Sequence, residues 1–372
     1  MRSPQGHSTT PAATNAAQRH DETPAVAAQG SAWLACPECG RPLRQDHQEL
    51  QCPECLNSWP VIDGVPHFVG EFPYWGEIPQ EQMQGVNRAA AAGPWKSALL
   101  DSPETSVRGA SDMILNLERA NWHCLVDLPP DSRALDLGAG MGTTCHALAL
   151  YYREVIALEP VLERVDFMRE RFAQEKLSNV KVVRSSLWTL PFAPGSMDLV
   201  SMNGVLEWVA QGRAGDPAAL QERALNNVLR MLRPGGYFYL GIENRLGLGY
   251  FAGYRDPHCG LPYVTVLPRP LAHWYSRRRG QPEGYRNYLY SSWGYRKLLQ
   301  RAGFSDVQVY LALPSYNHPR YLIPLEGNLF SFYSRTFNSV HASRAKELIH
   351  DLLLKSGMLK YFEYSFAILA RK

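Results

Sequence analysis

Four cysteines stand in two CxxC pairs near the start of the sequence. Cys36, Cys39, Cys52 and Cys55 lie in the stretch CPECGRPLRQDHQELQCPEC. Two such pairs can place four thiolates at the corners of a tetrahedron, which is how structural Zn²⁺ is held. The alternatives are two disulfides or four separate thiols. No apolar secretion signal is found in the first thirty residues, and this favours metal over disulfides.

Four protein ligands leave no open position on the metal, so we expect the zinc to hold structure and not to react. The following stretch, LNSWPVIDGVPHFV, alternates apolar and polar residues around a DG pair and predicts a short hairpin. A module of about 40 residues has too small a core to be stable alone, and the metal would supply the missing stability. We therefore expect a zinc module over residues 32–70.

A glycine-rich loop is the second candidate site. It reads Asp136-Leu-Gly138-Ala-Gly140-Met-Gly142 and follows an apolar, strand-like run. Glycine lets the backbone turn sharply and come close to a ligand. The dinucleotide fingerprint has its last glycine at the sixth position, where this chain has Thr143. Glycines at the first, third and fifth positions after an acid instead indicate an S-adenosylmethionine (SAM) loop.

The surrounding sequence alternates strand-like and helix-like stretches from Arg133 onward. Examples are ALDLG, TTCHALALYY, EVIALEP and LERVDFMRERFAQ. This order predicts a parallel sheet with helices on both faces, and ligands of such sheets bind beyond the carboxyl ends of the strands. Glu159 ends the second strand, where a carboxylate can accept hydrogen bonds from both hydroxyls of a ribose.

With these motifs, residues 110–245 resemble the class I SAM-dependent methyltransferases. The resemblance implies a doubly wound, mostly parallel seven-stranded sheet, Rossmann-like in its winding. It also implies that the three glycines line the methionine and ribose of SAM and that Glu159 binds the ribose. Ser186 and Leu187 would lie beside the adenine and Asn203 near the methyl group. Many relatives have Asp where this chain has Ser186, so the adenine amine is expected to be held less strongly, or by the backbone.

Residues 33–69 resemble the small zinc-ribbon domain found at the N-terminus of several bacterial methyltransferases, in the frame CPxC…CxxC…WPVxDGVPxF. Between this ribbon and the core, residues 71–130 are predicted to form a helical lead-in, with helices near 78–92 and 109–125. The latter has apolar residues spaced by three and four. Residues 1–31, rich in Ala, Thr, Pro and Gln, are predicted to be a disordered tail. The methyltransferase domain is expected over 131–372.

Two insertions interrupt the expected methyltransferase order, at about 246–290 and 314–360. Insertions after strands lie over the ligand, so we expect them to build the acceptor pocket. The first is dense in Tyr, Arg and His. His258, backed by Asp256, is our first candidate for a general base, and Glu207 is the second. His258 could instead be a structural residue of a turn in DPHCG, and Glu207 could be the first acid of a helix. A general base is also not obligatory, because alignment of the reactants can by itself lower the barrier to methyl transfer.

Three shorter stretches carry weaker predictions. ENR at 243–245 is expected to fix a loop. LPSYNHPRYLIPL is expected to be a loop with structural prolines, from which His318 and Arg320 could reach the pocket. SRRRG at 276–280 is expected to be solvated, with contact to a phosphate or an acidic substrate as the alternative. The segment IENRLGLGYFAGYRDPHCGLP, followed by GYRKLLQRAGF, resembles bacterial methyltransferases associated with glycan and cell-surface polysaccharide assembly. That resemblance implies a saccharide acceptor.

Composition limits the partners. The chain has 372 residues, 45% of them hydrophobic, and a net charge of only +3. No apolar run is long enough to span a bilayer, and we expect a cytoplasmic protein. The leading hypothesis is a SAM-dependent methyltransferase that acts on a saccharide or small polar metabolite, at oxygen.

Two other hypotheses stay open. The first is an rRNA or tRNA base methyltransferase, since some such enzymes also carry a zinc ribbon. Its ribbon would be basic, whereas residues 33–69 are acidic, and nucleic acid is therefore an unlikely partner. The second is a scaffold with a methyltransferase fold that has lost catalysis. In either case the ribbon is a possible docking surface for a partner protein.

Overall fold

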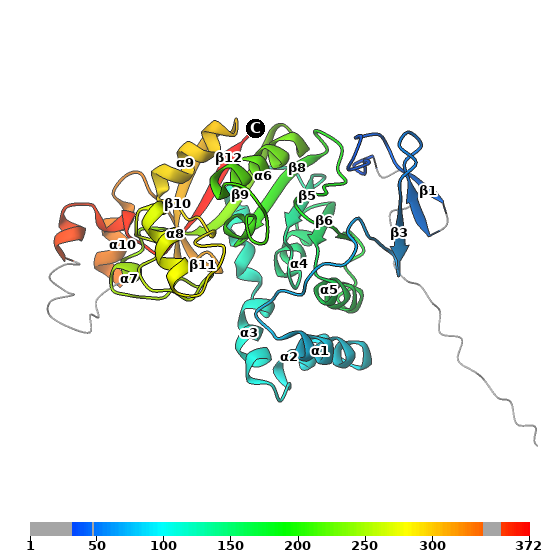
Figure 1. Cartoon of the computed structure of the whole chain (residues 1–372), viewed down its shortest axis with the longest axis horizontal. Helices are drawn as coiled ribbons and strands as arrows, with labels where there is room; N and C mark the ends of the chain where they lie inside the picture. Colours follow the sequence, from blue (N-terminus) through cyan, green and yellow to red (C-terminus); the bar gives the residue numbers. More distant parts are fainter. Residues whose placement is uncertain (1–31, 47, 338–350) are drawn as a thin grey trace, which may run out of the picture.

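A central sheet of eight strands forms the body of the computed structural model, which describes residues 32–46, 48–337 and 351–372 (Figure 1). The predicted tail 1–31 lies outside the described residues. The sheet order is β11-β10-β12-β9-β8-β5-β6-β7. The parallel strands are β5 (Arg133–Leu137), β6 (Glu154–Glu159), β7 (Val180–Arg184), β8 (Met197–Asn203) and β9 (Leu232–Glu243).

Three strands extend this parallel core with antiparallel pairing: β12 (Ser365–Arg371), β10 (Ser305–Ser315) and β11 (His318–Pro324). The predicted fold class is confirmed, with eight strands in place of seven. The additional strand is β11, so the loop that we predicted across LPSYNHPRYLIPL is wrong. The strand tolerates Pro319 and Pro324 because it lies at the sheet edge, where a missing N–H costs no ladder bond.

Alternation along each strand divides the core into two layers. Leu135 and Leu137 pack with α6 (Pro217–Met231) and α9 (Ser292–Arg301) on one face. Ala134, and the residues of neighbouring strands that face the same side of the sheet, pack with α4 (Thr143–Ala149) and α5 (Leu162–Gln174) on the other face. Both faces of the parallel strands are therefore buried, as their near-continuous apolar sequences predict.

The lead-in contains α1 (Gln80–Ala92), α2 (Trp95–Leu100), α3 (Thr105–Leu115) and the 3₁₀ helix η1 (Leu117–Leu125). The single helix predicted over 109–125 is wrong, because the chain breaks at Asn116. That residue is extended, and its side chain accepts a hydrogen bond from the Glu118 N–H. Asparagine favours such capping positions, and the continuous apolar face hid the break.

The two insertions contribute short elements beside the antiparallel end of the sheet. They include α7 (Leu248–Phe251), α8 (Arg269–Arg278), α10 (Leu329–Phe337) and η3 (Leu359–Tyr361). Residues 338–350 of the second insertion lie outside the described residues. Outside the insertions, the 3₁₀ helix η2 (Leu206–Trp208) follows β8. Figure 1 places α7, α8 and α10 at one end of the molecule and the ribbon at the other. Among the described residues, no helix is long and apolar enough to cross a membrane.

The N-terminal ribbon is a separate four-stranded antiparallel sheet in the order β1-β2-β3-β4. Its strands are β1 (Arg44–Asp46), β2 (Glu49–Gln51), β3 (Ser58–Ile62) and β4 (Val65–Pro66). The predicted hairpin is confirmed, since β3 pairs with β4 across Asp63 and Gly64. Both turn residues have positive φ, as a two-residue hairpin turn requires.

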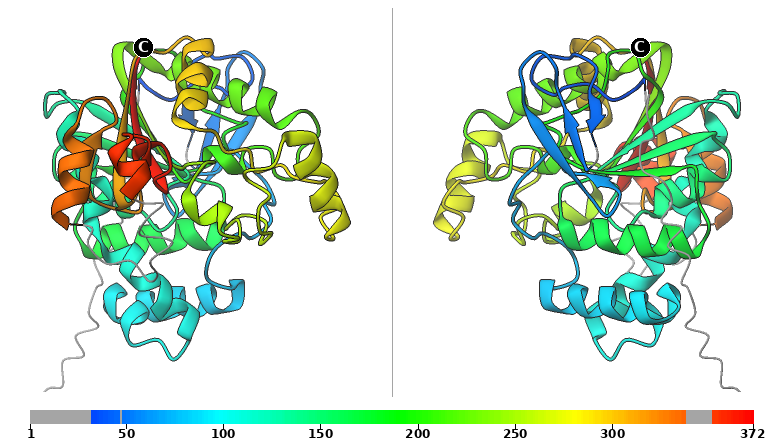
Figure 2. Two further views of the ribbon diagram at one scale, coloured as in Figure 1. Left: turned by 90° about the vertical axis from the view of Figure 1, so that its left-hand side faces the viewer. Right: turned by 90° about the vertical axis from the view of Figure 1, so that its right-hand side faces the viewer.

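The ribbon docks on the β7 edge of the large sheet, beside which it lies in Figure 2. Phe68 N–H donates to the Arg184 carbonyl (2.8 Å), and the Arg184 guanidinium donates to the carbonyls of Val69 and Gly70. On the ribbon's other side, Trp33 is 1% exposed and its ring packs on Phe192. The module therefore covers an edge that would otherwise be open to wrong pairing.

Candidate active site

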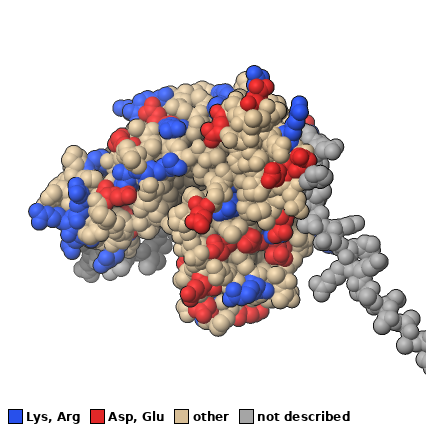
Figure 3. All heavy atoms as spheres, turned by 45° about the vertical axis from the view of Figure 1, so that its right-hand side comes forward, with Lys and Arg blue, Asp and Glu red and all other residues tan. Residues whose placement is uncertain are grey.

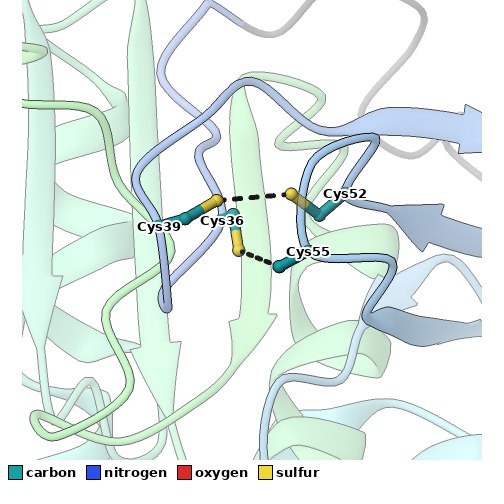
Figure 4. Close-up of side chains that lie close together, drawn as sticks. All are labelled: Cys36, Cys39, Cys52 and Cys55. Atoms are coloured by element: carbon teal, nitrogen blue, oxygen red, sulfur yellow. Dashed lines mark hydrogen bonds between the residues drawn. The ribbon is translucent and has the colours of Figure 1, made fainter.

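The four ribbon cysteines lie together, as predicted (Figure 4). Cys36 Sγ is 3.5 Å from Cys55 Sγ, and Cys39 Sγ is 3.4 Å from Cys52 Sγ. A disulfide would need about 2.05 Å, and four thiolates around Zn²⁺ stand about 3.8 Å apart for Zn–S bonds of about 2.3 Å. The sulfurs therefore fit a closed tetrahedral zinc site. The site lies in the ribbon, away from the strand ends of the large sheet.

The glycine loop joins β5 to α4 at the carboxyl edge of the sheet. Gly138, Gly140 and Gly142 all have positive φ, at 74°, 57° and 76°. A Cβ on Gly138 would lie 2.7 Å from the Val205 side chain, and one on Gly142 would lie 2.5 Å from Phe172. A Cβ on Gly140 would meet nothing within 4 Å. Gly138 and Gly142 are thus required by packing, whereas Gly140 borders open space suited to a ligand.

Replacing Gly142 with alanine is expected to destabilise the protein more than the same change at Gly140. Both substitutions cost about 1–2 kcal/mol because a side chain disfavours positive φ. Only the first also forces Phe172 to move, which adds about 1–3 kcal/mol. Urea-induced unfolding of the two variants checks this, and equal losses would contradict the packing argument.

The two predicted acids beside the glycine loop make different hydrogen bonds. Asp136 is 3% exposed and accepts hydrogen bonds from Ser201 Oγ (2.6 Å) and Cys145 Sγ (3.5 Å). Burial raises its pKa to about 6. Glu159 is 2% exposed and accepts from the N–H groups of Gly140 (2.9 Å) and Val161 (3.1 Å). Burial raises the pKa of Glu159 as well. The structure thus ties Glu159 to the loop, whereas Asp136 bonds inward.

The remaining predicted ligand-binding residues follow β7 and β8. Ser186 is 8% exposed, its Oγ accepts from the Trp188 N–H, and Leu187 packs partly buried beside it. Asn203 ends β8 and is 7% exposed, yet neither atom of its side-chain amide has a hydrogen-bond partner. A buried amide without partners is costly, so Asn203 is a candidate contact for a bound molecule.

A compact acid–imidazole cluster lies just beyond the ends of β8 and β9. His258 Nε2 is 3.6 Å from Glu207 Oε1 and 3.8 Å from Glu243 Oε2. The side chains of these three residues are at most 5% exposed. Both Glu207 oxygens and Glu243 Oε2 lack hydrogen-bond partners. Side chains from three parts of the chain therefore meet at one buried point, and two of them have polar atoms without hydrogen-bond partners.

The cluster is held in place by further bonds. Asp256 Oδ1 accepts from the N–H groups of His258 (2.8 Å) and Cys259 (3.0 Å) and lies 3.2 Å from His258 Nδ1. Tyr316 OH donates to Glu243 Oε1 (3.0 Å). Asp256 therefore acts on the site by orienting the imidazole, and Tyr316 by orienting one carboxylate.

The charges of the cluster are strongly coupled. Burial, together with the charge of the nearby Glu207 carboxylate, raises the pKa of Glu243 to about 7. Burial by itself would lower the pKa of His258, but Asp256, Glu207 and Glu243 outweigh this and raise it to about 11. At neutral pH His258 is therefore an imidazolium, which donates protons and does not accept them.

The cluster adjoins the glycine loop through shared neighbours. Val205, which lies over Gly138, directly precedes η2 with Glu207. Tyr316 OH, bonded to Glu243, would be 2.8 Å from a Cβ on Gly204. The glycine loop and the acid–imidazole cluster thus lie side by side along the carboxyl ends of β5, β8 and β9.

Sequence reasoning missed several residues of this site. Glu243 was expected only to fix a loop together with Asn244 and Arg245. Those two do so, bonding to the carbonyls of Tyr361, Glu363, Thr265 and Leu267, but Glu243 faces the cluster. Its position at a strand's carboxyl end, the same signal used for Glu159, could have identified it.

Two tryptophans beside the cluster were also missed. The ring of Trp208 packs edge-on against His258 (4.9 Å between centroids) and against Trp75 (4.5 Å). Trp75, from the lead-in segment, is 41% exposed. The Arg164 guanidinium lies over the ring at 4.9 Å, so Trp75 offers a partly accessible aromatic ring that is connected to His258 through Trp208.

A separate hollow of about 640 Å³ lies among α1, α2 and the loop after α2, lined by residues such as Gln82, Arg88 and Ser97. None of the strand-end residues above lines it. We do not assign the reaction to this hollow, because it lacks the acid–imidazole cluster and the glycine loop.

Comparison with protein families identifies two segments. Residues 135–240 match the model described as "Methyltransferase domain", and residues 33–64 match that described as "Trm112p-like protein". The biotin biosynthesis bifunctional protein BioHC of Cellvibrio japonicus is 33% identical over 133 residues, which are 35% of this chain and 24% of that protein. The uncharacterized methyltransferase YcgJ of Bacillus subtilis is 31% identical over 111 residues, or 30% and 40% of the two chains.

The chain thus spans about a quarter to about a half of the length of curated relatives such as these. Among solved structures, phosphoethanolamine N-methyltransferase 2 of Haemonchus contortus with S-adenosyl-L-methionine is 17% identical, with a TM-score of 0.43 over 74% of this chain and 59% of that one. The complex of the Haloferax volcanii Trm112 methyltransferase activator with the putative methyltransferase is 16% identical, with a TM-score of 0.40 over 77% and 96%.

Proposed function

We propose that this chain, which carries a SAM-dependent methyltransferase domain and a Trm112p-like zinc ribbon, methylates a hydroxyl oxygen of a saccharide or small polar metabolite. The observation that carries the choice of a hydroxyl is the buried cluster of Glu207, Glu243 and His258 beside the glycine loop. A hydroxyl must lose a proton when it is methylated, and this cluster contains carboxylate oxygens without partners.

Several residues fit the methyl donor. When bound, S-adenosylmethionine supplies a methyl group on an electron-poor sulfonium sulfur. We assign its ribose and methionine to the open side of Gly140, flanked by Gly138, Gly142 and Glu159. Ser186 and Leu187 would border the adenine, and the unpartnered amide of Asn203 would face the methyl end.

The acceptor proton is assigned to Glu207, with Glu243 sharing the charge. Both Glu207 oxygens lie buried without hydrogen bonds and are therefore free to receive a proton. His258 was our first candidate from the sequence, but with a pKa of about 11 it already holds its proton at neutral pH. In this proposal the His258 imidazolium lies against the carboxylates of Glu207 and Glu243, and Asp256 keeps the imidazole in place.

The exposed ring of Trp75 supports a saccharide acceptor. Sugars pack their apolar C–H faces on aromatic rings, and Trp75 with Trp208 leads from the surface to His258. Figure 3 shows acidic side chains gathered on the face that carries the ribbon and the lead-in helices. Such a surface repels a phosphate backbone, so it counts against an RNA acceptor.

The ribbon has a partner within its own chain. Its bonds to β7 precede Ser186 and Leu187, the proposed adenine neighbours. We therefore propose that the ribbon holds this edge of the cofactor site in shape. Docking to a second protein is not needed for that role.

The test is a transfer assay with methyl-labelled SAM and a cell extract fractionated into RNA, protein, polysaccharide and small molecules. We expect label in the polysaccharide or small-molecule fraction. Label in RNA that is lost on nuclease treatment would replace the proposal with a nucleic-acid methyltransferase. No label together with no binding of SAM would indicate an inactive scaffold.

Replacing Glu159 with glutamine is expected to weaken SAM binding by about 10- to 100-fold. The change removes the charge from hydrogen bonds that, when charge-assisted, contribute about 1.5–3 kcal/mol each. Titration calorimetry with S-adenosylhomocysteine measures the effect. Glu170→Gln on α5 is the matched control, and equal affinity in the two variants would remove Glu159 from the binding site.

A further inference from the structure

We propose that Glu207, Glu243 and His258 bind one divalent metal ion, at a site distinct from the zinc of the ribbon. The three side chains offer two carboxylate oxygens and one imidazole nitrogen, and these atoms all lie within 4.8 Å of one another. This set of hard oxygen and borderline nitrogen ligands suits ions such as Mn²⁺, Fe²⁺ or Zn²⁺.

The spacing is close to what one ion requires. Ligands at about 2.1 Å from a metal stand about 3.0 Å apart when adjacent and about 4.2 Å apart when opposite. The distances from His258 Nε2 to the two carboxylates are 3.6 and 3.8 Å, within that interval. Binding would therefore need only small rotations of side chains, with no rearrangement of the strand ends.

An independent observation points to a missing ligand. The Glu207 side chain is 1% exposed, and neither of its oxygens has a hydrogen-bond partner. Glu243 Oε2 is likewise buried without a hydrogen-bond partner. Buried carboxylates are normally paired or bound to a metal, because desolvating a charge is costly. An ion at this point would coordinate carboxylate oxygens that otherwise face only the His258 ring, at 3.6 and 3.8 Å.

The surrounding bonds are those of an outer shell around a metal. Asp256 lies 3.2 Å from His258 Nδ1, which leaves Nε2 turned toward the two glutamates. Tyr316 holds the other oxygen of Glu243, and Tyr285 OH donates to Asp256 Oδ2 (3.4 Å). Histidine ligands commonly have a carboxylate on the second ring nitrogen, which fixes the tautomer and the ring orientation.

The open positions of the ion have a use that rests on the proposed function. The ribbon cysteines close their metal with four ligands, whereas three protein ligands leave room for oxygens of another molecule. An acceptor with two neighbouring hydroxyls could occupy these positions beside the glycine loop. The ion would then orient the hydroxyl to be methylated, with one Glu207 oxygen as a ligand and the other left to receive the acceptor's proton. The His258 imidazolium would release its Nε2 proton when the ion binds.

The competing explanation is that the His258 imidazolium is itself the permanent cation of the cluster. Titration of the zinc-loaded full-length protein with Mn²⁺ decides between a metal ion and the imidazolium. Binding is measured as the loss of the electron paramagnetic resonance signal of free Mn²⁺. We expect one further Mn²⁺ per chain, with magnetic coupling to an imidazole nitrogen. Glu207→Gln and His258→Asn should each weaken binding by more than about tenfold, because loss of a ligand should cost at least as much as the 10- to 100-fold typical for an outer-shell partner.

Glu283→Gln, an exposed glutamate in the same insertion, is the matched control and should bind Mn²⁺ normally. S-adenosylhomocysteine binding and the unfolding midpoint, measured on the same samples, show that each variant is folded. Absence of Mn²⁺ binding at millimolar concentration, or binding that both cluster variants retain, would overturn the metal site. If the unaltered protein does not bind S-adenosylhomocysteine, that result would instead count against the proposed function.

Discussion

Replacing Cys36 and Cys39 with serine is expected to unfold the ribbon and to destabilise the whole protein by about 3 kcal/mol or more. Zinc contributes about 10–16 kcal/mol to the folding of small zinc modules, and two ligands cannot hold it. Unfolding of the ribbon also removes its hydrogen bonds to β7, each of about 1 kcal/mol, and exposes the buried side chains of Trp33 and Leu34. Thermal and urea unfolding of the variant measure the loss.

The loss should extend to the cofactor site. Arg184 bonds to ribbon carbonyls on one side, and the chain continues from it to Ser186 and Leu187 on the other. We therefore expect weaker S-adenosylhomocysteine binding in the same variant, and in the native protein after removal of zinc by a chelator. Cys124→Ser is the control, because that exposed thiol is not one of the four ribbon cysteines. Unchanged stability after zinc removal would show that the ribbon is an independent module.

Replacing Glu207 with glutamine is expected to lower kcat by about 10²- to 10⁴-fold, the contribution of a general base. The amide has nearly the same shape, so the fold and the glycine loop should be unaffected. It cannot accept the acceptor's proton, however, and it is a poor metal ligand. Steady-state transfer to the labelled fraction, with S-adenosylhomocysteine binding measured in parallel, separates catalysis from cofactor binding.

Two comparisons sharpen this result. Glu283→Gln should retain full activity because its side chain is 56% exposed and lies outside the cluster. Tyr316→Phe should lose less than Glu207→Gln, since it removes only one hydrogen bond to Glu243. Full activity in Glu207→Gln would remove this residue from the reaction and leave alignment alone to explain the rate.

The repeating sequence patterns predicted most of the fold correctly. The order of strands and helices from Arg133 to Glu243 follows from apolar runs and glycine stops, which depend on local chain geometry. The exceptions have local causes too. Asn116 ends α3 by capping the next turn, and β11 forms at an edge where its prolines do no harm.

The sequence by itself determined the parts of the site that are contiguous in the chain. The CxxC pairs and the loop from Asp136 to Gly142 are identified by spacing alone, because their ligand atoms come from neighbouring residues. A CxxC turn around a metal and a tight glycine turn each have few conformations, so the residue types at fixed spacing largely define the structure of the turn.

Only the tertiary structure decided how the distant parts meet. It joins Glu243 to Glu207 and His258, brings Trp75 from the lead-in to Trp208, and docks the ribbon on β7. No local pattern encodes these contacts, since they depend on how the insertions fold back over the sheet. The protonation of His258 depends on them as well, because three carboxylates around a buried imidazole raise its pKa and change what it can do.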